Sequence, residues 1–330
     1  MNRNNISKIV MVVCAVILFA AVAMGVKNIA WSAGYQYENA EKYTAGGTSI
    51  SEPVKNLDVD WIDGKVEIAY EDGNTVTFSE KSEKKLNGDQ ELRWWLDGET
   101  LRIRYAKTGM HLNWNLHKEL TITLPEGIVL ENADLSATSG KINVPAMETD
   151  NLKLDTTSGE IYALAAAGKV SANATSGDIE LVIGKEAEEI KAGATSGNIL
   201  IESADAGLIQ VDATSGNIQV KAGNVKSFHA DSTSGKMSAE LGEVEEADFE
   251  CTSGGVEVGI AKLGKLKVSS TSGDVTATLP EKPGFTARLD VTSGDIGYDL
   301  SLAKEGSEYI CGDGSGSVEI STTSGDIYIK

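Results

Sequence analysis

The tripeptide Thr-Ser-Gly occurs ten times in this chain, and the distance from one copy to the next hardly changes. The copies stand at 138–140, 157–159, 175–177, 195–197, 214–216, 233–235, 252–254, 271–273, 292–294 and 323–325. The successive spacings are 19, 18, 20, 19, 19, 19, 19, 21 and 31 residues. Self-similarity at about 20 residues is typical of arrays in which each repeat packs on its neighbours. The sequence therefore predicts a stack of ten similar units.

Residues on both sides of each Thr-Ser-Gly alternate between apolar and polar. The residue three before the Thr is apolar in all ten copies, from Leu135 to Ile320. The residue four after the Thr is also apolar in every copy, from Ile142 to Ile327. The residue four before it is polar throughout. Because successive side chains of a strand point to opposite faces, this pattern predicts two half-buried strands per repeat.

The Gly of the repeat suits a corner that needs a positive φ angle. We expect the Thr and Ser beside it to stack on their copies in ladders of hydroxyl groups. A role for the ten serines as nucleophiles is disfavoured, because no base recurs beside them.

Residues 51–130 also alternate but lack the repeat, and they hold four of the five tryptophans. A stack of repeats must cover its open apolar end, so we expect an irregular N-terminal β cap here. The predicted fold is all-β: a parallel two-sheet β-solenoid (β-helix) of about ten 19-residue coils over residues 131–330, preceded by this cap.

An uncharged run of 18 residues, Ile9–Val26, precedes the β region. As a helix it would span roughly 27 Å, close to the hydrocarbon thickness of a membrane. Basic residues lie before it, which predicts a cytoplasmic tail at 1–8, one transmembrane helix at 9–27, a linker at 28–50 and an extracytoplasmic bulk. The alternative is a cleaved signal peptide with its small-residue site at Ala21–Ala23.

Charge and cysteine content exclude several classes of function. Residues 1–27 hold three basic and no acidic residues, so the rest carries 26 basic and 49 acidic ones, a net charge of −23. Such a surface disfavours nucleic acid as a partner. The three cysteines include no C-x-x-C, so zinc and redox motifs are absent and no cofactor is expected.

Three carboxylates recur two residues before the Thr of consecutive repeats, at Asp212, Asp231 and Glu250. At a strand spacing of about 4.8 Å they would repel one another by roughly 0.9 kcal/mol in water, which a divalent cation could relieve. We keep them as weak metal candidates, with an acidic surface column as the more ordinary interpretation. Stacked carboxylates also keep open the alternative of a polysaccharide-acting β-helix enzyme.

Trp94, Trp95 and Trp114 are the candidate ligand-contact aromatics, as a platform for sugar or peptide. Cap packing is the alternative. No catalytic residues are predicted, since the chain carries no H-E-x-x-H, G-x-S-x-G or phosphate-binding motif.

The end of the repeats differs from their middle. The long last spacing contains an insertion at 298–318 with glycines 312, 314 and 316, and the chain stops just after its final strand. We expect the insertion to fold back as a cap. The alternative is an open end that pairs with another copy or a partner strand.

The run Leu120-Thr-Ile-Thr-Leu-Pro-Glu-Gly127, the repeated Thr-Ser-Gly-Asp/Asn-Ile and the closing Thr323–Ile329 resemble the bacterial "putative adhesin" β-repeat family, over about residues 50–330. The resemblance implies a bacterial envelope protein, often linked with envelope stress, and no catalytic residues. The expected function is a non-catalytic extracytoplasmic scaffold or adhesin-like binding protein, whose partners are cell-wall glycan or another envelope protein. End-to-end self-association is a further alternative.

Overall fold

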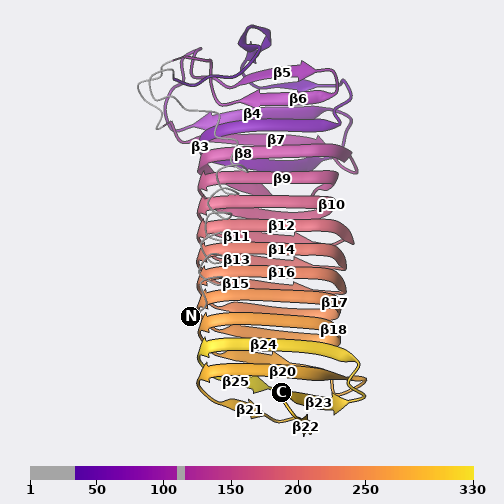
Figure 1. The fold of residues 1–330 in the computed structure, drawn as a ribbon. Coiled ribbons are helices and arrows are strands. Elements are labelled where there is room, and N and C mark those ends of the chain that lie inside the picture. The colour runs from indigo at the N-terminus through magenta and orange to yellow at the C-terminus, as the bar shows by residue number, and fades with distance from the viewer. Residues whose placement is uncertain (1–33, 110–115) are drawn as a thin grey trace. The chain divides into compact units, whose positions relative to one another are not determined.

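A computed structural model describes residues 34–109 and 116–330, which are mostly β-strand, with turns between the strands and a 3-10 helix at Ala40–Lys42 (Figure 1). The described residues fall into two compact units, 34–181 and 182–330. Each unit is considered by itself. The predicted tail and membrane helix at 1–27 lie outside the described residues, as do residues 28–33 of the predicted linker. The rest of that linker, 34–50, holds the 3-10 helix and two short strands. Within the part of the chain that is described, no helix is long and apolar enough to cross a membrane.

Unit 34–181 begins with short strands and continues with long ones. Its strands are β1 (Thr44–Ala45), β2 (Thr48–Ile50), β3 (Asn56–Glu71), β4 (Val76–Ser82), β5 (Arg93–Asp97), β6 (Thr100–Arg104), β7 (Lys118–Pro125), β8 (Val129–Val144), β9 (Glu148–Ser158) and β10 (Ile161–Ser176). Strand β11 (Ile179–Ile183) crosses the boundary to the second unit.

Strand β3 pairs in parallel with β8, β8 with β9, and β9 with β10. The register places Asp63-Gly64 opposite Ser139-Gly140, so β3 follows the same path as a repeat although it lacks the Thr-Ser-Gly sequence. Antiparallel pairs enclose these strands at β1–β5, β2–β4, β4–β7 and β5–β6. Residues 51–130 are therefore only partly an irregular cap.

Unit 182–330 contains most of the repeats. Its strands are β12 (Ala187–Ser196), β13 (Ile199–Ser203), β14 (Ala206–Ser215), β15 (Ile218–Ala222), β16 (Val225–Ser234), β17 (Met237–Ser253), β18 (Val256–Ser272), β19 (Val275–Thr278), β20 (Gly284–Ser293), β21 (Ile296–Tyr298), β22 (Ala303–Glu305), β23 (Glu308–Gly312), β24 (Gly316–Ser324) and β25 (Ile327–Ile329).

Two parallel ladders run through this unit, one on each side of the Thr-Ser-Gly corner. The first joins β12, β14, β16, β17 and β18, and the second joins β13, β15, β17, β18 and β19. Register is preserved throughout, so that Ser196, Ser215 and Ser234 lie opposite one another. The predicted alternation is confirmed: the two apolar columns are buried, with Ile296 as the exception.

The corner glycines show why the repeat needs this residue. Gly216 has a φ of 134°, and a Cβ there would lie 2.0 Å from the carbonyl oxygen of Gly197 in the preceding repeat. Both the positive φ and the close approach exclude a side chain. The corner ladder is made by backbone groups, as where the Gly197 N–H donates to the Ser215 carbonyl at 3.0 Å. The Asn198 side chain extends it by accepting the Asn217 N–H at 3.0 Å.

The tenth repeat does not follow the ninth in space. Strand β24 lies between β18 and β20, and β25 lies between β19 and β21 (Figure 1). The Gly273 N–H accordingly donates to Ser324, and the Gly325 N–H to Ser293. The ninth repeat is therefore the last rung of the unit, and the final strand of the chain is covered on both sides.

The prediction of a parallel two-sheet β-solenoid of ten coils is wrong in this form. Strand β17 pairs with β15 through its first half and with β16 through its second, so the two ladders belong to one sheet. The last two repeats are stacked in inverted order. The insertion forms an antiparallel hairpin, β22–β23, whose second strand pairs with β20, and it thus folds back as expected.

Candidate functional site

The three predicted carboxylates lie side by side on the outer face of unit 182–330. Parallel pairing of β14, β16 and β17 places Asp212 opposite Asp231, and Asp231 opposite Glu250. Alternation keeps them outside the core, because Val211, Ala230 and Phe249 point inward from the same strands. The in-register repeat thus converts a spacing of 19 residues into adjacency.

A second polar column flanks the first, two residues earlier along each strand. It contributes Gln210, His229 and Asp248, which are also in register. The Gln210 Nε2 donates to Asp212 Oδ2 at 3.1 Å, and His229 Nε2 lies 3.0 Å from Asp231 Oδ2. We call Gln210, Asp212, His229 and Asp231 the acid–histidine cluster.

The electrostatics of this cluster follow from burial and from the single cation within it. Burial, reinforced by the charge of Asp231, raises the pKa of Asp212 to about 6. The hydrogen bond to Asp231 raises the pKa of His229 to about 9. At neutral pH the imidazolium therefore neutralises part of the carboxylate charge, which explains how the column is tolerated.

Glu250 belongs to a different pairing. Its carboxylate lies 3.6 Å from Lys267 Nζ, which also contacts Asp248 at 3.1 Å. Within the described parts of the chain, no group of three or more His, Cys, Asp or Glu side chains is arranged to hold a metal ion. The column is better described as a row of hydrogen-bond donors and acceptors: an amide, an imidazolium, carboxylates and an ammonium group.

The candidate tryptophans do not form a common platform. Trp94 and Trp95 are neighbours on β5 and so point to opposite faces. Trp94 packs edge-on against Phe78 with ring centroids 5.3 Å apart. Trp95 packs against Tyr43, and Lys42 Nζ lies 4.5 Å from its ring centroid. Trp114 lies outside the described residues.

A buried charge in unit 34–181 was not identified from the sequence. Lys118 is fully buried, and its ammonium lies 2.6 Å from Glu80 Oε2 and donates to the carbonyl oxygens of Gln90 and Tyr105. Burial lowers the pKa of Lys118. The signal was present, because Lys118 shares a strand face with Leu120, Ile122 and Leu124. The group stabilises the unit from within and does not reach solvent.

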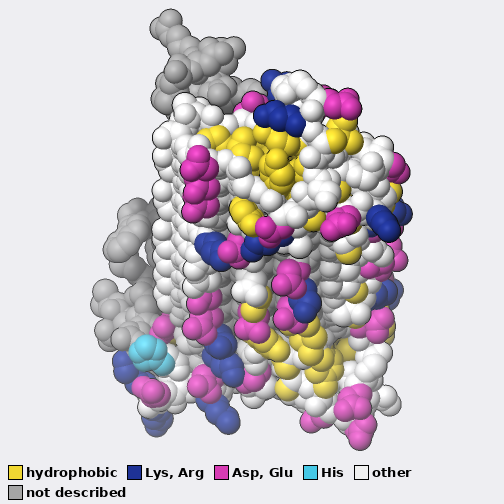
Figure 2. Space-filling view, turned by 90° about the horizontal axis from the view of Figure 1, so that it is seen from below, with side chains coloured by type: hydrophobic (Ala, Val, Ile, Leu, Met, Phe, Trp, Pro, Cys, Tyr) yellow, Lys and Arg dark blue, Asp and Glu magenta, His cyan; other side chains and the backbone are white. Residues whose placement is uncertain are grey.

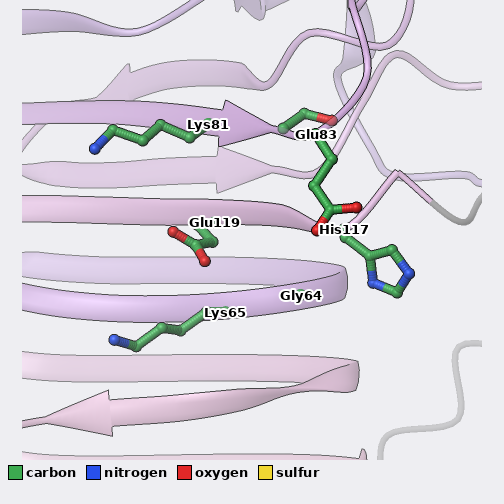
Figure 3. A pocket seen from close by; sticks show the side chains of 7 residues that line it. Gly64, Lys65, Lys81, Glu83, His117 and Glu119 are labelled. Atoms are coloured by element: carbon green, nitrogen blue, oxygen red, sulfur yellow. The ribbon is translucent and has the colours of Figure 1, made fainter.

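An open depression of about 570 Å³ lies on the same unit between β3, β4 and β7 (Figure 3). Lys65, Lys81 and His117 line it together with Glu83 and Glu119. Lys65 is paired with Glu67 at 2.7 Å, and His117 Nδ1 lies 3.5 Å from Asp63. Mixed charge and wide opening make this a weaker candidate than the acid–histidine cluster.

Comparison with known proteins supports the resemblance found in the sequence. The model of the family described as Toastrack DUF4097 matches residues 54–260 and, in a second overlapping match, 167–330. A structure described as a "putative adhesin" from Parabacteroides distasonis ATCC 8503 is 14% identical over 87% of this chain and 97% of that one, with a TM-score of 0.48. A "putative cell adhesion protein" from Clostridium sporogenes ATCC 15579 is 13% identical over 87% and 99%, with a TM-score of 0.21.

These two likenesses are too distant to carry an argument about function. No curated protein matches the chain significantly. The predicted resemblance to an adhesin-like β-repeat family is nevertheless confirmed, since the family match extends over most of the chain.

Proposed function

The chain belongs to the Toastrack DUF4097 family, and we propose that it is a non-catalytic, adhesin-like binding protein that acts outside the cytoplasm. The observation that carries this proposal is the in-register polar surface of unit 182–330, where four side chains of the acid–histidine cluster come from two adjacent repeats. Such a surface repeats the same kinds of group from strand to strand. It therefore suits an extended ligand better than a compact one.

The chemistry of the cluster favours a hydroxyl-rich ligand. Gln210 and His229 donate hydrogen bonds, while Asp212 and Asp231 accept them. We therefore propose cell-wall glycan as the ligand class, with another envelope protein as the alternative partner.

Binding to purified cell walls tests this proposal. We expect the full chain to sediment with insoluble walls, and the variant His229→Gln with Asp231→Asn to bind about 10-fold more weakly, because two charge-assisted hydrogen bonds are lost. Glu240→Gln, which removes an exposed charge from the other ladder, is the matched control. Equal binding of all three proteins would exclude the cluster as the contact surface.

The same preparation tests the alternative of a polysaccharide-cleaving enzyme. The raised pKa of Asp212, about 6, is the observation that favours it, because general acids work best with a pKa close to the operating pH. Release of soluble wall fragments that is abolished in Asp212→Asn would establish cleavage and overturn the non-catalytic proposal.

Display at the membrane surface and a link to envelope-stress signalling are part of the same proposal. The uncharged run at 9–26 supports the first. Membrane fractionation and protease accessibility of intact cells test it: a soluble mature chain starting near Met24 would favour a cleaved signal peptide. An envelope-stress reporter that is unchanged by deletion of the protein would exclude the second.

A further inference from the structure

The end rung of unit 182–330, which we define as residues 289–298, is incompletely covered. The tenth repeat lies between the eighth and the ninth, so the ninth repeat forms the boundary of the unit. The β22–β23 hairpin pairs with β20 only at Gly284–Arg288. Among the described residues, no strand is hydrogen-bonded to the outer edge of Leu289–Tyr298.

The apolar side chains of this rung show the same lack of cover. Leu289 is buried, but Ile296 is only half-buried. Tyr298 is 44% exposed although it packs edge-on against Tyr309 of β23, with ring centroids 5.9 Å apart. Ile329 and Ile327, directly opposite them on β25, are fully buried. Figure 2 looks onto this end of the unit and shows hydrophobic side chains exposed among acidic and basic side chains.

The backbone groups that join one repeat to the next are also free at this edge. Elsewhere the corner Gly N–H donates to the next rung, and the Asn or Asp after it accepts an N–H from that rung. In the end rung, the Gly294 N–H and the Asp295 carboxylate have no such partner within the described part of the chain. The Asp295 N–H donates to Asp326 Oδ1 of the tenth repeat at 2.8 Å.

Charge decides between two kinds of strand that could complete the edge. Residues 288–299 carry three aspartates, Asp290, Asp295 and Asp299, and one basic residue, Arg288, which is paired with Asp290 at 3.3 Å. A second copy of the chain would bring the same three carboxylates opposite them, which is unfavourable. A strand that carries basic residues would be attracted.

We propose that the end rung binds an extended, basic strand of a partner protein, which adds to β20 and β21 in parallel and continues the corner ladder. Apolar residues at alternate positions of that strand would cover Ile296 and Tyr298. Lysine or arginine between them would face the three aspartates. This contact is distinct from the glycan surface proposed above and does not depend on it.

A labelled 12-residue peptide that alternates valine with lysine and threonine serves as the probe, with fluorescence anisotropy of the full chain as the measurement. A peptide of equal charge with proline at every third position is the control, because proline cannot donate backbone hydrogen bonds. We expect binding of the first peptide alone, weakened by salt. Equal binding of both peptides would show general charge attraction and overturn the proposal.

Variants of the end rung locate the contact. Tyr298→Ser should weaken binding about 10-fold, whereas Leu164→Ser, which removes a similarly exposed apolar side chain (37%) from β10, should not. Asp295→Ala should weaken peptide binding about 5-fold and Asp295→Asn about 2-fold. Asn keeps a side-chain oxygen that can accept a backbone N–H, as the Asn198 side chain does from Asn217. Thermal melting checks that each variant is folded.

Sedimentation of the full chain over a range of concentrations tests whether a second copy of the chain binds to the end rung instead. We expect no association through this edge. Reversible association that Tyr298→Ser abolishes would identify a second copy as the occupant and overturn the proposal of a basic partner. Unchanged peptide binding by Tyr298→Ser and Asp295→Ala together would also overturn it.

Discussion

The two units differ in whether they bury charged side chains. Unit 182–330 buries hydroxyl groups such as Ser232, Ser270 and Thr322 but, among its described residues, no charged side chain. Unit 34–181 buries Lys118 and Arg104, each beside a carboxylate, Glu80 and Asp58. A regular repeat places polar side chains outside by alternation alone. A region without the repeat must neutralise the charges that its irregular strands turn inward.

This difference has a consequence for function. Where polar side chains stay outside in register, they form continuous columns that a ligand can contact. Where charged side chains are paired inside, they stabilise one arrangement of strands, and fewer charged groups remain at the surface to contact a ligand. The acid–histidine cluster and the end rung both lie in unit 182–330, as this comparison would lead one to expect.

The largest expected effect is in the irregular unit. Lys118→Met leaves the carboxylate of Glu80 buried without its cation, and should lower the free energy of unfolding by about 3–5 kcal/mol. Adding Glu80→Gln, which keeps an acceptor for the Leu92 N–H, should recover about half of the loss. Denaturant unfolding measures both. An unfolding midpoint that Lys118→Met leaves unchanged would show that the pair contributes nothing.

A charge placed in the regular core should have a similar effect, with a nearby control. Ile199 is 1% exposed, so Ile199→Asp should cost about 3–4 kcal/mol. Leu200 is half-buried and faces outward, and Leu200→Asp should cost under about 1 kcal/mol. Should the two variants melt at the same temperature, alternation would not be what sorts side chains in this unit.

Much of the fold and of the candidate site could be predicted from the sequence, because each position of the repeat can be compared across ten copies. The buried columns, the positive φ of Gly216 and the adjacency of Asp212, Asp231 and Glu250 all follow from one register. The inverted order of the last two repeats could not be predicted, since local alternation is identical in either order. The apolar strand face that Lys118 shares with Leu120 and Ile122 indicates that Lys118 is buried, but the sequence does not reveal that Glu80 is its partner.

Two glycines distinguish the cost of a positive φ angle from the cost of a steric clash between an added Cβ and a neighbouring carbonyl oxygen. Gly216→Ala meets both a positive φ and a carbonyl oxygen at 2.0 Å, and should cost about 2–3 kcal/mol. Gly73 has a φ of 145°, but a Cβ added there would meet no atom within 4 Å, so Gly73→Ala should cost about 1 kcal/mol. Equal losses in chemical denaturation would attribute the whole requirement to φ.

The smallest expected effect is a pH dependence of stability confined to the acid–histidine cluster. The pKa of His229 rises to about 9 on folding, so its contribution is fully present below about pH 6.5 and is lost as pH rises through 9. Asp212 has a raised pKa of about 6, so its contribution is fully present below about pH 4 and is lost as pH rises through 6. Stability should therefore fall with rising pH, by about 1 kcal/mol for His229 after screening by solvent.

His229→Gln should flatten the melting temperature between pH 6.5 and 9, and Asp212→Asn should flatten it between pH 4 and 6. Lys153→Gln, in the other unit, is the control that should leave both limbs in place. A wild-type profile without slope in either range would mean that the cluster is fully solvated.

The inverted stacking of the last two repeats determines which edge of unit 182–330 is free, and engineered disulfides test it most directly. Ser269 lies opposite Ser321, and Ser321 lies opposite Asp290. In a background without the three native cysteines, Ser269→Cys with Ser321→Cys should form a disulfide on mild oxidation, because neighbouring strands lie about 4.8 Å apart. Ser269→Cys with Asp290→Cys, two strands apart, should not. A disulfide in the second pair and none in the first would mean that the repeats stack in sequence order, and the end rung would then not be the ninth repeat.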